Sequence, residues 1–234
     1  TWRKVNDDPN LNFRPFYYSD LRVDPKTPER LYTLSGGLSM STDGGRTFGA
    51  PVVVSPVGDS FDIDLGPGKV ARLLPLPTIA RNGTAVVVAW NQGAKDASHI
   101  LWSASTDGGA TWSPTTSVPV ADGEDFQPAL TADAKGLHLA YYHRNTDRTV
   151  DVLLADSTNG SAWTTKRVTS KPFPGVLNNP QFDPVIAQGY MGDYIAAVAS
   201  GGSLYLAWGD NRDVVKNSLW PAGRNDPDVF FARR

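Results

Sequence analysis

The sequence predicts an all-β fold of about four repeated antiparallel sheets, on the evidence of its strand pattern and an internal repeat. Short runs rich in β-branched and aromatic residues alternate with Gly, Pro, Asn and Asp clusters, and almost no stretch has helical spacing. The motif Ser-Thr-Asp-Gly-Gly begins at Ser41 and again at Ser105, and a weaker copy begins at Ser157. Intervals of about 50 to 65 residues are typical of four-stranded propeller blades. The sequence therefore predicts a β-propeller.

The same four elements are expected in each unit of a single domain, with units of approximately 1–48, 49–112, 113–163 and 164–234. The first strands are expected at 17–23, 76–80, 127–132 and 194–199. The second strands, three of which end in an aromatic residue, are expected at 31–34, 85–90, 137–142 and 204–208. The third strands are expected at 37–40, 100–104, 151–155 and 228–232. The repeated turn and the fourth strands follow, at 47–54, 111–118 and 163–169.

The fourth unit ends at its third strand, and Thr1–Val5 at the other end of the chain resembles the close of the turn followed by a fourth strand. Two arrangements are compatible with this pattern. The N-terminal strand either completes the last blade of a closed ring, which removes exposed sheet edges, or belongs to part of a larger ring.

The repeated turn is expected to be structural rather than catalytic. Its Asp can accept hydrogen bonds from turn amides, its glycines tolerate positive φ, and its closing aromatic residue can pack between strands. The residues assigned to this role are Ser41, Asp43, Gly45, Phe48, Ser105, Asp107, Gly109, Trp112, Asn159 and Trp163.

Composition excludes several classes of protein. A formal charge of -2 and a pI near 5.9 supply no basic field for nucleic acid. The chain has no cysteine for disulfides or thiolate zinc sites, and no apolar run long enough to span a membrane. It begins without a basic-then-apolar leader, which indicates a mature, trimmed or partial chain.

The S-x-D-x-G-x-T-[FW] repeats at Ser41 and Ser105 resemble the Asp-box, or BNR, repeats of sialidase-like β-propellers, and the resemblance covers nearly the whole chain. Residues 17–48 also resemble units of xyloglucanase- and sortilin-type propellers. The last third is similar to bacterial proteins labelled sialidase. This resemblance implies a propeller, in a secreted or cell-surface protein of bacterial type, and is compatible with hydrolases and with binding proteins.

Function is expected on the face opposite the repeated turns, where the longest polar loops lie. Each unit has one arginine near this rim, namely Arg14, Arg72, Arg144 and Arg212. The resemblance implies that three arginines, Arg14, Arg144 and Arg212, clamp a substrate carboxylate. Salt bridges to neighbouring aspartates are the alternative.

The rest of a sialidase site, as the resemblance implies it, would be a tyrosine nucleophile activated by a glutamate, with an aspartate as acid/base. Glu124 is the glutamate on the loop face, Tyr190 (or Tyr194) its tyrosine, and Asp62 the acid/base. The family's Arg-Ile-Pro motif is replaced at Arg14 by Arg-Pro-Phe, which places Arg14 outside the pattern.

Two functions therefore remain open: a sialidase-type hydrolase, and a propeller that binds a glycan or protein ligand without catalysis. For binding, Trp220, Asn178 and Arg72 are the candidate contacts. No cofactor is expected. The alternate acids Asp59, Asp62 and Asp64 could hold calcium, although a solvated loop explains them too. The oligomeric state stays open.

Overall fold

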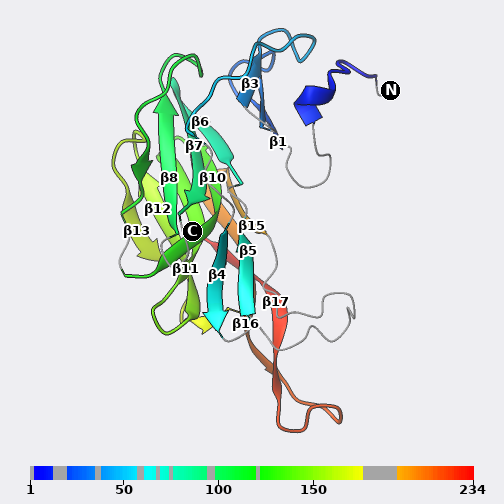
Figure 1. Cartoon of the computed structure of the whole chain (residues 1–234), viewed down its shortest axis with the longest axis vertical. Coiled ribbons are helices and arrows are strands. Elements are labelled where there is room, and N and C mark those ends of the chain that lie inside the picture. Colours follow the sequence, from blue (N-terminus) through cyan, green and yellow to red (C-terminus); the bar gives the residue numbers. More distant parts are fainter. Residues whose placement is uncertain are drawn as a thin grey trace.

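The computed structural model describes residues 3–12, 20–34, 38–56, 61–66, 69–73, 76–93, 98–119, 122–175 and 194–234. It confirms the all-β prediction: the described residues form antiparallel sheets and one 3₁₀ turn, η1 (Pro9–Asn12). Figure 1 shows four blades that follow one another in chain order, from β1 and β3 at the top to β16 and β17 at the bottom.

The blades have the predicted meander order. Blade 1 contains β1 (Asp20–Val23), β2 (Leu31–Leu34) and β3 (Leu38–Ser41), with a single bridge from Leu38 to Val52 in place of a fourth strand. Blade 2 contains β6 (Thr78–Asn82), β7 (Ala85–Gln92), β8 (His99–Ser105) and β9 (Thr116–Ser117). Blade 3 contains β10 (Glu124–Asp133), β11 (Gly136–Arg144), β12 (Thr149–Ser157), β13 (Thr164–Arg167) and the short β14 (Phe173–Pro174), which pairs with β12. Blade 4 contains β15 (Ile195–Ser200), β16 (Ser203–Val215) and β17 (Arg224–Arg233).

Three buried apolar layers separate the four blades, because alternate side chains of each strand point to opposite faces of the sheet. Blades 1 and 2 share a layer that includes Tyr32, Val88 and Trp90. Trp102 and Tyr141 belong to the layer between blades 2 and 3. Blades 3 and 4 share the layer with Phe126, Tyr142, Leu206 and Trp208. The second-strand aromatics Trp90, Tyr142 and Trp208 are therefore core residues.

The polar side chains of the repeated turn form hydrogen bonds within the turn itself. Asp107 accepts hydrogen bonds from the Thr111 hydroxyl (2.6 Å), the Thr111 amide (2.9 Å) and the Ser105 hydroxyl (2.7 Å). The Ser105 hydroxyl in turn accepts from the amide of Gly109, whose φ is 101°. The hydrogen bonds from Thr111 hold the pKa of Asp107 well below its usual value. Asp107 is thus an organiser of its own loop.

The copies of this turn at Ser41 and Ser157 follow the same scheme. Asp43 accepts from the Thr47 hydroxyl at 2.6 Å and from the Ser41 hydroxyl at 2.8 Å. In the third copy Asn159 replaces the aspartate and accepts from the amide and hydroxyl of Ser161, at 3.0 and 2.7 Å. In this third copy a single amide oxygen accepts both hydrogen bonds, whereas Asp107 uses both of its carboxylate oxygens.

Two segments expected to be loops contain strands. Residues 55–72 contain β4 (Phe61–Gly66) and all but the last residue of β5 (Lys69–Leu73), and these two strands form a separate hairpin. Ile63 and Leu65 of this hairpin are buried in the layer between blades 3 and 4. In blade 4, β16 and β17 both extend into the expected loop of residues 209–227 and form a long arm that projects at the lower end of Figure 1.

The N-terminal segment lies against blade 1. Asn6 donates a hydrogen bond through Nδ2 to the carbonyl of Arg46 (2.8 Å), and Val5 lies beside Gly45. Residues 3–8 form no strand, and within the described residues β17 pairs with β16 alone. The described sheets therefore form an open series, and the N-terminal segment is not in a ladder with blade 4.

Candidate functional site

The loop face is built from the start of each first strand and the end of each second strand. In blade 3 these ends are adjacent, because Glu124 at the start of β10 is the register partner of Arg144 at the end of β11. The Nη1 of Arg144 lies 3.1 Å from the Oε2 of Glu124. Glu124 is only 1% exposed, so its carboxylate lies beneath the surface of this face.

The β4–β5 hairpin covers this ion pair. Arg144 donates through Nε to the backbone carbonyl of Asp64 (2.5 Å). The neighbouring Arg148 donates through Nη2 to Oδ2 of Asp64 at 3.0 Å. The structure thus brings together Glu124 and Arg144, two predicted site residues, and adds Asp64, which lies 60 positions before Glu124 and 80 before Arg144 in the sequence. Each charge in the cluster has a protein partner.

The candidate calcium site is only partly described. Asp62 and Arg72 are backbone partners in the β4–β5 hairpin, and Asp59 lies outside the described residues. Asp64 is engaged by Arg148. Among the residues that the structure describes, no group of three or more His, Asp or Glu side chains could hold a metal ion.

A second buried pair lies beside Glu124, and sequence reasoning did not single it out. Nδ1 of His143 contacts Oδ1 of Asp125 at 2.8 Å, and Asp125 is fully buried. Burial raises the pKa of Asp125, an effect that the hydrogen bond from His143 opposes. The Ser98 hydroxyl donates to the Asp125 carbonyl (2.6 Å), which ties blade 2 to blade 3. The sequence offers no signal for this pair, because the expected strands at 127–132 and 137–142 end short of both residues.

Arg212 is held mainly by Asp210, its neighbour on β16. Its Nε lies 2.9 Å from both carboxylate oxygens of Asp210, its Nη2 contacts the same carboxylate, and its Nη1 donates to the Ser170 hydroxyl at 3.0 Å. Its guanidinium carbon lies 4.6 Å from the centroid of Phe230. The hydrogen bonds to Asp210 raise the pKa of Arg212, and its side chain is 9% exposed. The guanidinium therefore has little surface left for a ligand.

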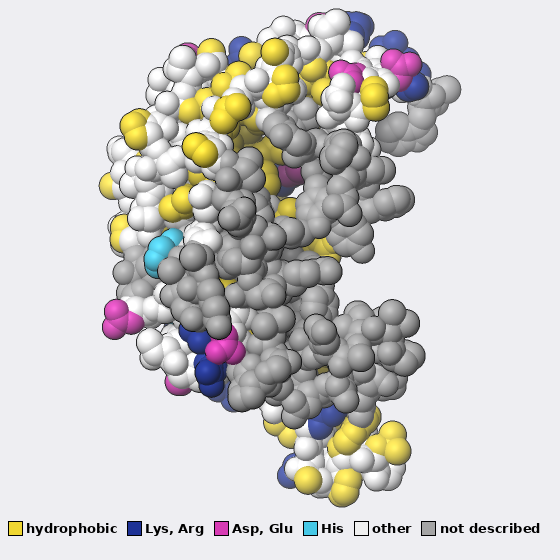
Figure 2. Space-filling view, in the orientation of Figure 1, with side chains coloured by type: hydrophobic (Ala, Val, Ile, Leu, Met, Phe, Trp, Pro, Cys, Tyr) yellow, Lys and Arg dark blue, Asp and Glu magenta, His cyan; other side chains and the backbone are white. Residues whose placement is uncertain are grey.

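The tip of the β16–β17 arm is the exposed part of this face. Asn217 closes the tip by accepting hydrogen bonds from the amides of Leu219 (2.9 Å) and Trp220 (3.0 Å). The guanidinium carbon of Arg224 lies 4.4 Å from the centroid of the Trp220 ring, and Leu219 is 75% exposed. Figure 2 shows hydrophobic side chains gathered at this lower end of the molecule.

The remaining predicted residues are not placed together by the described structure. Arg14, Tyr190 and Asn178 lie outside the described residues. Tyr194, the alternative nucleophile, is 68% exposed. The roles assigned to these residues and to Arg72 and Asp62 stay predictions. Among the residues described, no helix is long and apolar enough to cross a membrane.

Comparisons with known proteins show similarity in fold. No protein-family model matches the sequence, and no curated protein matches it. The phage phi92 endosialidase aligns with a TM-score of 0.55 at 11% identity, over 91% of this chain and 34% of its own. The polysaccharide lyase Uly1 aligns with a TM-score of 0.49 at 12% identity, over 92% of this chain and 57% of its own. A lectin from Aleuria aurantia, in complex with α-methyl-L-fucoside, aligns with a TM-score of 0.42 at 15% identity, over 91% of this chain and 60% of its own.

The endosialidase match, at 11% identity, supports the fold alone. The chain spans 34% of the endosialidase chain and 57% and 60% of the other two. The names of all three proteins refer to binding or cleaving carbohydrates.

Proposed function

We propose that this protein is a sialidase-like Asp-box propeller that recognises a glycan through its loop face and does not hydrolyse it. The observation that carries the proposal is the tip of the β16–β17 arm, where the half-buried side chains of Trp220 and Arg224 lie side by side with ring and guanidinium 4.4 Å apart. Arg224 also forms an ion pair with Asp226. An aromatic ring can pack on the C–H face of a sugar, and the guanidinium N–H groups that Asp226 does not engage can donate to its hydroxyls or carboxylate.

The absence of hydrolysis is proposed from the state of the charged residues. A carboxylate clamp needs arginines whose N–H groups face a ligand, whereas Arg212 is committed to Asp210 and Ser170. A general base for a tyrosine must reach it, whereas Glu124 is buried and paired with Arg144 beneath the hairpin. These contacts favour the salt-bridge interpretation of the rim arginines.

A glycan array followed by calorimetry with the best-bound glycan tests the binding proposal. We expect Trp220→Ala to weaken binding by roughly tenfold or more, as for a central aromatic contact. Leu219→Ala is the matched control, because Leu219 is the adjacent residue in the same tip and is 75% exposed. Equal affinity of the wild type and Trp220→Ala would remove Trp220 from the site. Binding to no glycan would turn the search to protein ligands.

Hydrolysis of a fluorogenic N-acetylneuraminic acid glycoside separates this proposal from the hydrolase hypothesis. We expect no turnover by the wild type. Turnover that disappears in a folded Arg212→Ala variant would establish an arginine-dependent sialidase site and contradict the proposal.

A further inference from the structure

The chain contains two Asn-Gly pairs, and both lie in tight turns on the face opposite the loop face. Asn82-Gly83 lies in the hairpin that joins the first strand of blade 2, β6, to its second strand, β7. Asn159-Gly160 lies in the repeated turn of blade 3, between β12 and β13. The same dipeptide therefore occurs in two different surroundings within one molecule.

An Asn-Gly pair can modify itself, and the reaction consumes only water. The backbone nitrogen of the glycine attacks Cγ of the asparagine side chain. A new bond from nitrogen to Cγ closes a succinimide ring, the bond from Cγ to Nδ2 breaks, and ammonia leaves after taking up the amide proton. Water then opens the ring at either carbonyl and gives aspartate or isoaspartate. Glycine favours the attack because it has no Cβ to obstruct it, and asparagine is a heat-sensitive residue.

The surroundings of Asn82 leave both reacting groups unengaged. Asn82 and Ala85 are register partners, so Gly83 and Thr84 form the turn, and both of these turn residues are exposed. Gly83 has a φ of 62°, and a Cβ built on it would meet nothing within 4 Å. In the part of the chain that the structure describes, no hydrogen bond involves the Asn82 side chain or the Gly83 amide.

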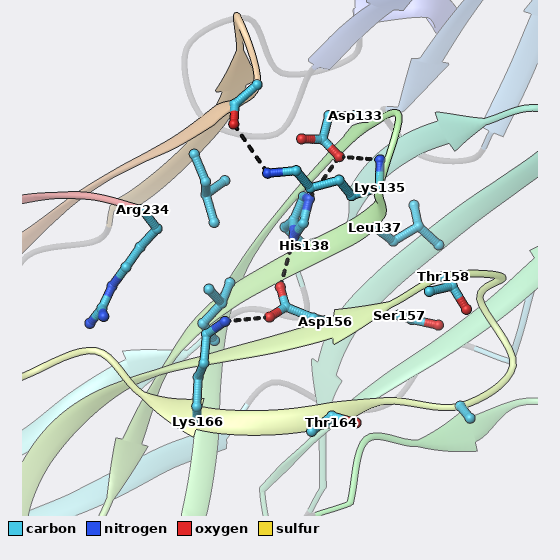
Figure 3. Close-up of a pocket in the computed structure, with 14 residues that line it drawn as sticks. Asp133, Lys135, Leu137, His138, Asp156, Ser157, Thr158, Thr164, Lys166 and Arg234 are labelled. Atoms are coloured by element: carbon cyan, nitrogen blue, oxygen red, sulfur yellow. Dashed lines mark hydrogen bonds and ion pairs between the residues drawn. The ribbon is translucent and has the colours of Figure 1, made fainter.

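Both reacting groups of the Asn159-Gly160 pair are engaged. The Gly160 amide donates a hydrogen bond to the Ser157 hydroxyl at 3.0 Å, and Gly160 is buried. Oδ1 of Asn159 accepts from the amide and the hydroxyl of Ser161, at 3.0 and 2.7 Å. Figure 3 shows Ser157 where β12 leads into this turn, beside a pocket of about 520 Å³. Attack on Asn159 would have to break these hydrogen bonds first.

The Asp-Gly pairs in the other two copies of the turn are protected in a related way. An Asp-Gly pair can close the same ring with loss of water, but an ionised carboxylate is a poor target for the attacking nitrogen. Hydrogen bonds from Thr47 hold the pKa of Asp43 well below its usual value, and the copy at Asp107 behaves alike. The Gly44 amide also donates to the carbonyl of Glu29 at 2.9 Å. The repeated turn thus shields its own reactive pairs.

We propose that the β6–β7 hairpin is a site of spontaneous deamidation at Asn82, whereas the repeated turn protects Asn159. The reaction adds a negative charge next in sequence to Arg81, which forms an ion pair with Asp24 of blade 1. The isoaspartate product also adds a methylene to the backbone between β6 and β7, which disturbs the pairing with Ala85. This inference goes beyond the proposed glycan site, which lies on the opposite face.

Peptide mapping by mass spectrometry tests the proposal on the full chain. The protein is incubated in mildly alkaline buffer, once folded and once unfolded in guanidinium chloride. In the folded protein we expect aspartate and isoaspartate to accumulate several times faster at Asn82 than at Asn159. In the unfolded protein the two positions should react at similar rates, because both asparagines precede a glycine and the turns are gone.

Three variants assign the effect to particular residues. Asn82→Gln should remove the modification from the hairpin, since glutamine cyclises far more slowly than asparagine. Ser157→Ala removes the hydroxyl that accepts from the Gly160 amide, so it should speed deamidation at Asn159 and leave Asn82 unchanged. Ser117→Ala, the same change at an exposed site on β9, should alter neither rate.

Two results would overturn the proposal. One is equal rates at Asn82 and Asn159 in the folded protein. The other is a folded protein in which Asn82 is stable while the unfolded chain reacts, because the hairpin itself would then be protective. Circular dichroism shows whether each sample is folded, and the comparison within the wild type decides even where a variant unfolds. Glycan binding by Asn82→Gln should match the wild type, so failure of one proposal leaves the other standing.

Discussion

The carboxylate of Asp107 shows how one residue contributes to the fold without belonging to the core. The carboxylate oxygens accept hydrogen bonds from the hydroxyl and the amide of Thr111, at 2.6 and 2.9 Å, and these hydrogen bonds lower the pKa of Asp107. A carboxyl whose pKa is lower in the folded protein than in the unfolded chain stabilises the fold above the unfolded pKa of about 3.9. That stabilisation is lost as pH falls through the folded pKa.

We therefore predict that Asp107→Asn lowers the melting temperature at pH 7, because half of the asparagine head group is a donor facing the Thr111 donors. The difference in melting temperature between wild type and variant should shrink below about pH 4, where the wild type begins to lose the stabilisation from its ionised carboxylate. Thermal melts at pH 7 and pH 3 measure both effects. Asp7→Asn, at a surface position 82% exposed, is the control. A deficit independent of pH would show that the charge of Asp107 is not what matters.

At the scale of elements, the β4–β5 hairpin determines what the loop face can do. It inserts Ile63 and Leu65 into the layer between blades 3 and 4 and covers the Arg144–Glu124 pair through Asp64. Ile63 is fully buried. The hairpin is therefore part of the core as well as part of the rim.

We predict that Ile63→Ala destabilises the protein by about 2–5 kcal/mol, the range for truncating a buried aliphatic side chain. Urea denaturation followed by fluorescence measures this change. Val53→Ala, at a side chain 78% exposed, should change the free energy of unfolding by less than about 0.5 kcal/mol. Similar small effects of both substitutions would mean that the hairpin packs only loosely.

Blade strands were predictable because their apolar residues alternate between short turns. The expected strands at 85–90 and 137–142 appear as Ala85–Gln92 and Gly136–Arg144. The hairpin was not predictable in the same way, because Asp62 and Asp64 alternate with Ile63 and Leu65 and drew attention as acids. Its apolar face can be recognised as part of the core only once blades 3 and 4 are packed together.

Candidate site residues were harder to predict than strands. Glu124 and Arg144 were both singled out, but as separate parts of a catalytic site, and the structure joins them in one buried ion pair. Asp125 and His143 were missed because they are distant in sequence and become neighbours only through the β10–β11 register. Pairings of this kind depend on register, which motif spacing does not report.

For the whole molecule, the three apolar layers give inner and outer blades different support. Among the described residues, blades 2 and 3 each contact two layers, whereas blades 1 and 4 each contact one. We predict that amide hydrogens of β11 and β12 exchange most slowly and those of β1 and β17 fastest, because opening an outer blade exposes less buried surface. Hydrogen exchange followed by mass spectrometry measures this gradient. Uniform protection across all blades would indicate a single cooperative unit.

The β16–β17 arm also has a consequence for handling the protein. Its tip is closed by the hydrogen bonds that Asn217 accepts from the amides of Leu219 and Trp220, and Leu219 is 75% exposed. Exposed tips of this kind are preferred sites of proteolytic cleavage. Trace proteases in a preparation should therefore cut this tip before they cut the blades.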